Sequence, residues 1–209
     1  MTASATGIIL RTRPLTETSI IVHWLTEEHG RLATVAKGAR RPKSEFRGKL
    51  DLFYAADFSF SHSRRSELHT LREVSLRDAH AELRNDLGWL QQASYVAKLI
   101  EQTTETETPL PGIFELLQVF LTSLPSRPPQ PRNIFAFELK LLGKLGLSPD
   151  IDQLRLTPGA KKLMTALTET SWPAIAELKA TSPQAAELRQ FLHDFLIYHL
   201  GKIPNGRML

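Results

Sequence analysis

The stretch SIIVHWLTEEHGRLATVAKG, residues 19–38, decides the fold. Its first eight residues are rich in β-branched, aromatic and other apolar side chains, a composition that favours a β-strand. Glu28-His29-Gly30 then predicts a tight turn, because glycine adopts backbone conformations that other residues resist. Residues 31–38 predict a second strand, and a turn this short joins antiparallel neighbours.

Similar short apolar runs lie on both sides of this hairpin and predict strands over residues 7–12, 50–60 and 67–74. Parallel neighbours need crossovers of a dozen or more residues, and the connections here are shorter, so we expect antiparallel pairing. Five strands in about 75 residues match the size of an OB-fold. The prediction for residues 1–78 is therefore a five-stranded OB-fold β-barrel.

After residue 78 the apolar residues recur every three or four positions, which is typical of amphipathic helices. Proline-bearing N-caps at Thr157 and Ser182 and a C-terminal glycine at Gly146 mark helix ends. The predicted helices cover residues 80–102, 113–124, 132–145, 158–169 and 183–200, with a short one from residue 172. The fold class is therefore α+β in two domains, with the barrel at 1–78 and an all-α helical domain at 79–209.

Composition excludes several classes of protein. The 209 residues contain no cysteine, which excludes disulfides, a thiolate nucleophile and cysteine-based metal sites. No apolar run is long enough to span a membrane, and the N-terminal residues do not read as a secretory signal. We therefore expect a soluble cytoplasmic protein that does not engage a membrane.

The sequence offers no chemistry for catalysis. Its seven histidines form no HExxH motif and have no carboxylates at metal-ligand spacing. There is no GxSxG nucleophile motif, no P-loop and no GxGxxG. The prediction is a protein that is not an enzyme, with no catalytic residue, metal, cofactor or small-molecule substrate.

The positive charge is concentrated in one stretch. Residues 1–80 carry 13 Lys and Arg against 9 Asp and Glu, whereas residues 81–209 carry 13 of each. Residues 31–49 hold seven basic side chains and one acid, Glu45. A solvated surface loop would explain such a run, but its position beside the ligand-binding strands of a predicted OB-fold favours a polyanion-binding site.

Several motifs resemble the bacterial RecO family of recombination mediators. They are TGIILRTRP at residues 6–14, ETS at 17–19, LTEEHGR at 25–31, VAKGARR at 35–41, FELKLLGKLG at 137–146 and YHLG at 198–201. The resemblance implies an OB domain and a helical domain, binding to single- and double-stranded DNA, and annealing of complementary strands. It also implies action with RecR in the RecF pathway to load RecA onto strands coated by single-strand-binding protein, and hence a nucleoid-associated location.

The chain departs from this family in one place. Many relatives carry a four-cysteine zinc module after the central helix, whereas only LSPDIDQLRL, residues 147–156, lies here. The resemblance therefore implies a member without the zinc module. Contacts that relatives make through that module, including part of a RecR interface, are in doubt for this chain.

Two sets of site residues are predicted. The DNA-binding set consists of basic side chains that neutralise phosphates and one aromatic, Phe46, that stacks on bases: Arg11, Arg31, Lys37, Arg40, Arg41, Lys43, Phe46, Arg47, Lys49, Arg64 and Arg65. The resemblance implies a second site for the acidic, Phe-ended tail of single-strand-binding protein: Arg132, Phe135, Leu139, Lys140, Leu142 and Lys144. An ordinary amphipathic core helix with exposed lysines would explain the second set equally well.

Two other functions are compatible with an OB-fold. The barrel of a protein–protein adaptor would bind a partner, and its affinity would not respond to charge reversal at Arg40 and Arg41. An RNA-binding OB protein would depend on the ribose 2′-hydroxyl. Both alternatives leave the helical domain without a role.

Overall fold

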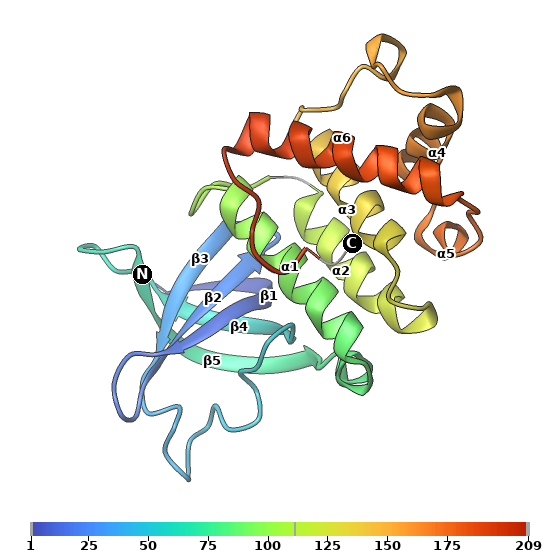
Figure 1. The fold of residues 1–209 in the computed structure, drawn as a ribbon. Helices are drawn as coiled ribbons and strands as arrows, with labels where there is room; N and C mark the ends of the chain where they lie inside the picture. The colour runs from blue at the N-terminus through green and yellow to red at the C-terminus, as the bar shows by residue number, and fades with distance from the viewer. Residues whose placement is uncertain (1, 111, 208–209) are drawn as a thin grey trace. The chain divides into compact units, whose positions relative to one another are not determined.

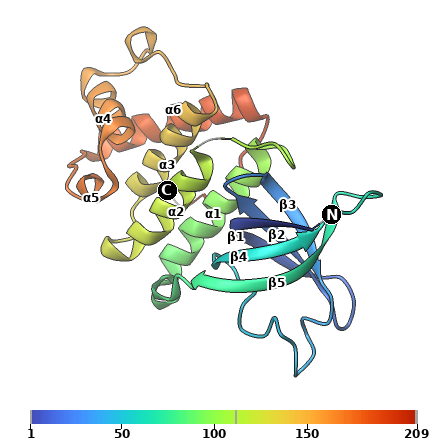
Figure 2. The same cartoon turned by 180° about the vertical axis from the view of Figure 1, so that it is seen from behind.

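The computed structural model describes residues 2–110 and 112–207. A closed five-stranded barrel in the N-terminal part is followed by a helical region, which confirms the predicted fold class (Figures 1 and 2). The chain divides into two compact units, one of Met1–Glu82 with Thr103–Glu115 and one of Leu83–Gln102 with Leu116–Leu209. The sequence predicted two continuous ranges and did not foresee that a later segment joins the barrel unit.

The barrel closes in the order β1-β2-β3-β5-β4. Its strands are β1 (Thr2–Pro14), β2 (Ile20–Thr26), β3 (Gly30–Ala36), β4 (Ala55–Ser61) and β5 (Leu68–Asp78). Four of the pairings are antiparallel, but β3 and β5 pair in parallel, with Thr34 opposite His69. The purely antiparallel pairing expected from short connections is therefore wrong at the closing seam, because β4 intervenes in sequence and gives β5 room to run alongside β3.

Alternation of apolar and polar residues places one face of each strand inside the barrel. Trp24 of β2 stacks on Phe58 of β4, with ring centroids 4.1 Å apart, and its indole nitrogen donates to the Thr34 hydroxyl at 2.9 Å. Phe60 is fully buried beside them. Because a buried indole needs a hydrogen-bond acceptor, Thr34 lets this large ring fill the barrel centre without an unpaired donor.

The predicted fourth strand begins later than expected. Residues 50–54 form turns, and β4 starts at Ala55. Phe53 has a φ of 67°, in the left-handed region that few non-glycine residues adopt, and its backbone N–H donates to the Ile9 carbonyl at 2.8 Å. The apolar composition of this stretch reflects burial of the Phe53 ring and not strand pairing.

A segment after the first long helix returns to the barrel. The Glu107 backbone N–H donates to the Arg31 carbonyl at 2.7 Å, and Thr106 forms a parallel bridge with Arg31. His69, 3% exposed, is bonded through Nε2 to the Glu107 carboxylate at 2.6 Å. These contacts fasten residues 103–108 along the first residues of β3.

The described residues form six α-helices: α1 (Leu87–Thr103), α2 (Ile113–Ser123), α3 (Pro131–Lys144), α4 (Pro158–Glu169), α5 (Trp172–Ile175) and α6 (Ser182–Leu200). Short 3-10 turns lie at Ala81–Asn85, Leu124–Ser126 and Ile151–Gln153. In the described part of the chain, no helix has the length and apolar character needed to cross a membrane.

Helix ends follow local capping chemistry. Thr157 caps α4 by accepting from the Ala160 N–H, as predicted. The predicted N-cap at Ser182 is wrong by one residue, because Thr181 and Gln184 form a capping box that begins α6. The predicted first helix begins late for a similar reason: the Asp86 carboxylate accepts from the Gly88 N–H at 2.6 Å and starts α1 there.

Candidate nucleic-acid interface

The predicted basic stretch forms an ordered loop between β3 and β4, which we call the basic loop (residues 37–49). Successive turns hold it, with backbone N–H groups donating three residues back from Arg41 to Gly38, from Ser44 to Arg41, from Arg47 to Ser44 and from Lys49 to Phe46. Hydrogen bonds of this i→i+3 kind close successive turns and hold the loop backbone in one conformation. The loop therefore presents its cations from a fixed backbone.

Most cations of the basic loop face solvent. Lys37, Arg40, Arg41, Lys43 and Arg47 are exposed, and Lys49 is half-buried. None of the five exposed cations forms an ion pair within the part of the chain that the structure describes. Positive charge that is not neutralised within the protein attracts polyanions.

The basic loop is attached to the turn between β1 and β2. The Arg40 backbone N–H donates to the Thr18 carbonyl at 3.0 Å, and the Gly38 N–H donates to the Ser19 hydroxyl at 3.4 Å. The basic loop and the β1–β2 turn lie at the same end of the barrel (Figure 1). The loop and the turn thus form one surface.

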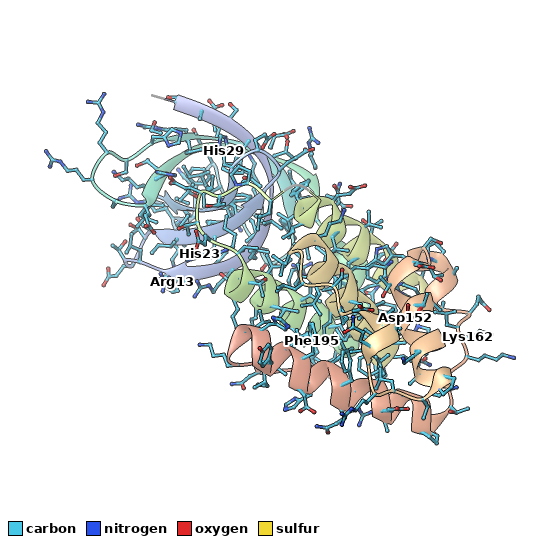
Figure 3. The ribbon with its side chains drawn as sticks, turned by 90° about the horizontal axis from the view of Figure 1, so that it is seen from above. Arg13, His23, His29, Asp152, Lys162 and Phe195 are labelled. Atoms are coloured by element: carbon cyan, nitrogen blue, oxygen red, sulfur yellow. The ribbon has the colours of Figure 1, made fainter. Side chains whose placement is uncertain are left out.

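The strands beside this end carry further positive charge. The register places Arg11 opposite His23 and Arg13 opposite Ile21, so these side chains share the outer surface of β1 and β2. Burial, together with the charges of Arg11, Arg13 and Arg31, lowers the pKa of His23 to about 4. His23 is therefore neutral at pH 7 beside Arg13 (Figure 3). Arg13 was not among the predicted residues, although its period-two spacing from Arg11 could have identified it.

The Arg31 side chain forms hydrogen bonds within the barrel unit. Its Nε donates to the Thr104 hydroxyl at 2.7 Å, and its Nη2 donates to the Thr104 carbonyl. These bonds fasten the returning segment to β3. The structure thus places this predicted DNA-binding residue in a packing contact and apart from the exposed cations of the basic loop.

Arg64 and Arg65 lie in the tip between β4 and β5, away from the basic loop. Parallel pairing of Ala33 with Leu68 puts this tip near the start of β3, whereas the basic loop follows the end of β3. Both arginines are exposed. The predicted DNA-binding residues therefore form two groups separated by the length of a seven-residue strand, about 20 Å.

The aromatic side chains near the basic loop are packed inward. Trp24 and Phe53 are buried, and Phe46, the predicted stacking residue, is half-buried against the barrel core with Leu50 and Tyr54. Part of the Phe46 ring remains accessible. The arrangement presents exposed charge with little exposed aromatic surface.

The second predicted site coincides in part with an apolar pocket in the helical unit. The pocket, of about 170 Å³, is lined by Arg132 and Phe135 of α3 and by Leu163 and Leu167 of α4, with Leu178 beyond α5. Other predicted members lie elsewhere. Leu139 and Leu142 are buried, Lys140 donates to the Thr168 and Thr170 carbonyls at 2.6 and 2.9 Å, and Lys144 is exposed at the end of α3.

Sequence reasoning missed one buried cation in the helical unit. Arg127 is only 4% exposed and donates to the Trp172 carbonyl at 2.8 Å, with its guanidinium 5.0 Å from the Trp172 ring centroid. Burial and the nearby charge of Arg132 lower the pKa of Arg127 to about 10. Its position in a proline-rich stretch gave no signal of burial.

No group of three or more potential metal ligands among histidine, cysteine and carboxylate side chains gathers in the ranges that the structure describes. The histidines nearest one another, His62 and His69, have ring centroids 4.8 Å apart and pack against Phe60.

Comparison with known proteins identifies similar sequences. A family model described as recombination protein O N terminal matches residues 1–80, and one described as recombination protein O C terminal matches residues 84–155. DNA repair protein RecO of Anaeromyxobacter dehalogenans (strain 2CP-1 / ATCC BAA-258) is 29% identical over 234 residues, covering 96% of this chain and 92% of the relative. DNA repair protein RecO of Bacillus subtilis (strain 168) is 33% identical over 152 residues, 73% of this chain and 59% of that protein.

Proposed function

The chain belongs to the RecO family of DNA repair proteins, and on that premise we propose that it is a non-enzymatic recombination mediator. It binds single- and double-stranded DNA through the barrel and anneals complementary strands. With RecR it helps load RecA onto DNA coated by single-strand-binding protein. A mediator of this kind acts in the cytoplasm, at the nucleoid.

The observation that carries this proposal is the basic loop. Its five exposed cations have no carboxylate partners in the described part of the chain, and they adjoin a strand surface that holds Arg11 and Arg13. Phosphate groups would replace the missing partners and release the ions condensed on DNA. Because these contacts address the backbone, binding is expected to be independent of sequence.

Annealing needs no bond-making residue. Two complementary strands repel each other through their phosphates, and a fixed cationic surface lowers that repulsion while base pairing supplies specificity. A surface of exposed arginines and lysines with little aromatic stacking suits this task, since stacked bases would have to be released before they pair.

The direct test is fluorescence anisotropy of a labelled oligo-dT across a salt series. If five cations engage one strand, log K should fall with log salt at a slope near −3.5. Arg40→Glu/Arg41→Glu/Lys43→Glu removes three contacts, so the slope should flatten by about 2 and affinity at 0.1 M salt should fall about 100-fold.

The matched control is Arg155→Glu/Lys162→Glu/Arg189→Glu, which changes the net charge equally at exposed positions of the helical unit. It should retain most of the affinity. Equal losses in both variants would contradict a site on the basic loop. Affinity that is unaffected by either variant would favour a protein adaptor, and a requirement for the 2′-hydroxyl would favour RNA.

A second part of the proposal concerns the apolar pocket in the helical unit. An acidic peptide ending in Phe would place its ring among Phe135, Leu163 and Leu167, with its carboxylate near Arg132. One feature supports this: the Arg132 guanidinium borders an otherwise largely apolar pocket and can attract a carboxylate there. We therefore propose this pocket for the tail of single-strand-binding protein.

A further inference from the structure

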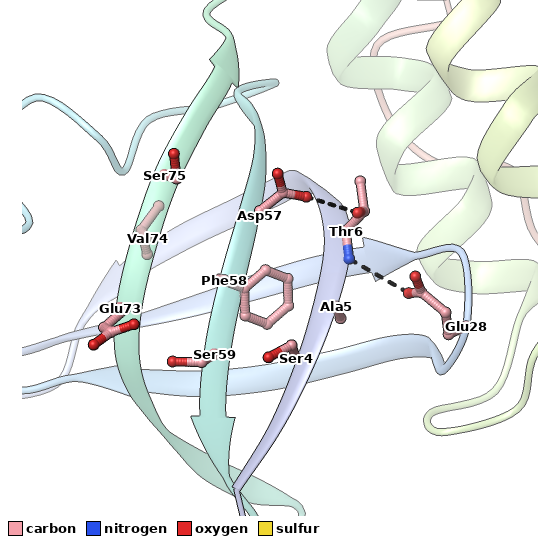
Figure 4. A pocket seen from close by; sticks show the side chains of 10 residues that line it. All are labelled: Ser4, Ala5, Thr6, Glu28, Asp57, Phe58, Ser59, Glu73, Val74 and Ser75. Atoms are coloured by element: carbon pink, nitrogen blue, oxygen red, sulfur yellow. Dashed lines mark hydrogen bonds between the residues drawn. The ribbon is translucent and has the colours of Figure 1, made fainter.

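The barrel carries a groove on the outer surface of β1, β4 and β5, away from the basic loop. Its volume is about 480 Å³, and Figure 4 shows the side chains that line it. The strand register aligns its lining in three rows across β1, β4 and β5: Ser4, Ser59 and Glu73; Ala5, Phe58 and Val74; and Thr6, Asp57 and Ser75. The middle row points into the barrel core, so the outer two rows form the walls of the groove.

The walls are made mainly of small hydroxyl side chains. Ser4, Ser59 and Ser75 leave the floor of the groove open, whereas larger residues would fill it. The Thr6 hydroxyl donates to Asp57 at 2.8 Å, which fixes one wall (Figure 4). This surface can therefore admit the side chains of an extended segment and offer them hydroxyl partners.

The charge of the groove is negative, in contrast to the rest of the barrel unit. Glu28, Asp57 and Glu73 line it, and none of its ten lining residues is basic. Residues 1–80 otherwise carry the whole positive excess of the chain. A polyanion is repelled from the groove and a cationic side chain is attracted to it.

An ion pair beside the groove indicates which kind of group these carboxylates bind. Arg77, just outside the groove, places its Nε 2.7 Å from an Asp57 carboxylate oxygen. This contact and the Thr6 hydroxyl lower the pKa of Asp57. The pair is exposed at both ends, so exchange of its guanidinium for one from another molecule costs little.

We propose that this groove docks an extended segment of a partner protein whose arginine or lysine side chains bind Glu28, Asp57 and Glu73. The carboxylates select the cations, and the serine walls allow the segment to lie close to the sheet. The basic loop and the groove lie apart and attract ligands of opposite charge. The barrel can therefore hold DNA and this partner at the same time. The proposal does not depend on DNA binding.

The probe is an acetylated and amidated peptide of alternating arginine and serine, titrated into the ¹⁵N-labelled full chain. Amide shifts should concentrate on Ser4, Thr6, Ser59 and Ser75. Glu28→Gln/Glu73→Gln should weaken binding about fivefold to tenfold, because two exposed ion pairs are lost. Ser59→Trp, which fills the groove without changing its charge, should weaken binding at least as much.

The control, Glu169→Gln/Glu177→Gln, changes net charge equally at exposed positions of the helical unit and should leave peptide affinity unchanged. Equal weakening by this control, or shifts spread over unrelated acidic residues, would overturn the proposal. So would a Ser59→Trp variant that folds and binds normally. The oligo-dT affinity of the groove variants should not fall, so this result and the DNA-binding result can fail separately.

Discussion

The barrel and the helical unit both contain clusters of basic side chains, but they use them in opposite ways. In the basic loop, Lys37, Arg40 and Arg41 project into solvent without ion-pair partners in the described chain. In the helical unit, Arg127 is 4% exposed and the side chain of Arg207 is 7% exposed, and each donates to acceptors within the unit.

This difference follows from the cost of burying charge. A solvated cation retains its hydration and remains available to phosphates, and its binding to them releases the ions condensed on DNA, which favours DNA binding. A buried cation must be compensated inside the protein, so its loss affects stability first. Exposed and buried arginines therefore lead to different expectations for the two units, and the following predictions test them.

The largest effect is expected at Arg207. Its guanidinium donates through Nε and Nη2 to Glu138 at 2.7 and 2.6 Å, and Glu138 is fully buried and also accepts from Tyr95 at 2.6 Å. Arg207→Ala leaves a buried carboxylate without its cation and should lower the free energy of unfolding by about 3–5 kcal/mol. Urea unfolding followed by circular dichroism measures this loss.

A double variant separates the pair from the surrounding packing. Glu138→Gln/Arg207→Met removes both charges, keeps an acceptor for Tyr95, and should recover most of the stability lost in Arg207→Ala. If Arg207→Ala lowered the free energy of unfolding by less than about 1 kcal/mol, the buried cations would contribute no more to stability than exposed ones do.

The next effect concerns the apolar pocket. Arg132→Glu should weaken binding of an acidic peptide ending in Phe about 10- to 100-fold, the range for loss of a hydrogen bond to a charged group. Lys144→Glu, an equal charge change at the exposed end of the same helix, should have little effect. Isothermal titration calorimetry measures both. A larger loss in Lys144→Glu would place the peptide on the helix surface instead of in the pocket.

His23 provides a pH-dependent test of the charged strand surface. Its pKa of about 4 lies below the ordinary 6.5, so the unfolded chain binds more protons between these values. The contribution of neutral His23 to the free energy of unfolding is therefore complete above pH 6.5 and is lost as the pH falls toward 4. The shift would correspond to about 3 kcal/mol for a fully buried ring, and because His23 is only half-buried we expect about half of that. Urea unfolding of His23→Gln should show a correspondingly smaller change with pH than wild type.

A smaller effect separates two arginines that the sequence placed together. Arg41→Gln should make the salt slope of oligo-dT binding shallower by about 0.7 and weaken binding about fivefold at 0.1 M salt. Arg31→Gln should leave the slope unchanged, because the Arg31 guanidinium is bonded to Thr104. Equal changes in slope would mean that Arg31 leaves Thr104 to bind phosphate.

The contrast between Arg31 and Arg41 also indicates how far the sequence can be interpreted. Strand and helix positions and the exposure of the basic loop follow from local composition and spacing, which act over a few residues. The bond from Arg31 to Thr104 joins residues 73 positions apart, and the parallel seam between β3 and β5 depends on barrel closure. No local pattern encodes such contacts.

The same reasoning explains Arg127 and the groove. Arg127 lies in a proline-rich stretch that predicts a surface loop, yet packing against Trp172 buries it. The groove combines Ser4, Ser59 and Glu73 from three strands, and only the register aligns them. Both features arise from tertiary packing, which single-residue propensities do not specify.

The smallest effect is expected at Phe46, where packing and base stacking make different predictions. Its ring lies half-buried against the barrel core, so Phe46→Leu keeps apolar contact while removing the flat aromatic face. If the ring serves packing, oligo-dT affinity should stay within about twofold of wild type; a base stacked on it would instead contribute about 1–3 kcal/mol, or roughly 5- to 150-fold. Phe46→Ala should lower thermal stability in either case, so only the leucine variant, measured by anisotropy at fixed salt, distinguishes the two roles. A large loss in that variant would mean that the basic loop binds bases as well as phosphates, and that its cations alone do not account for DNA affinity.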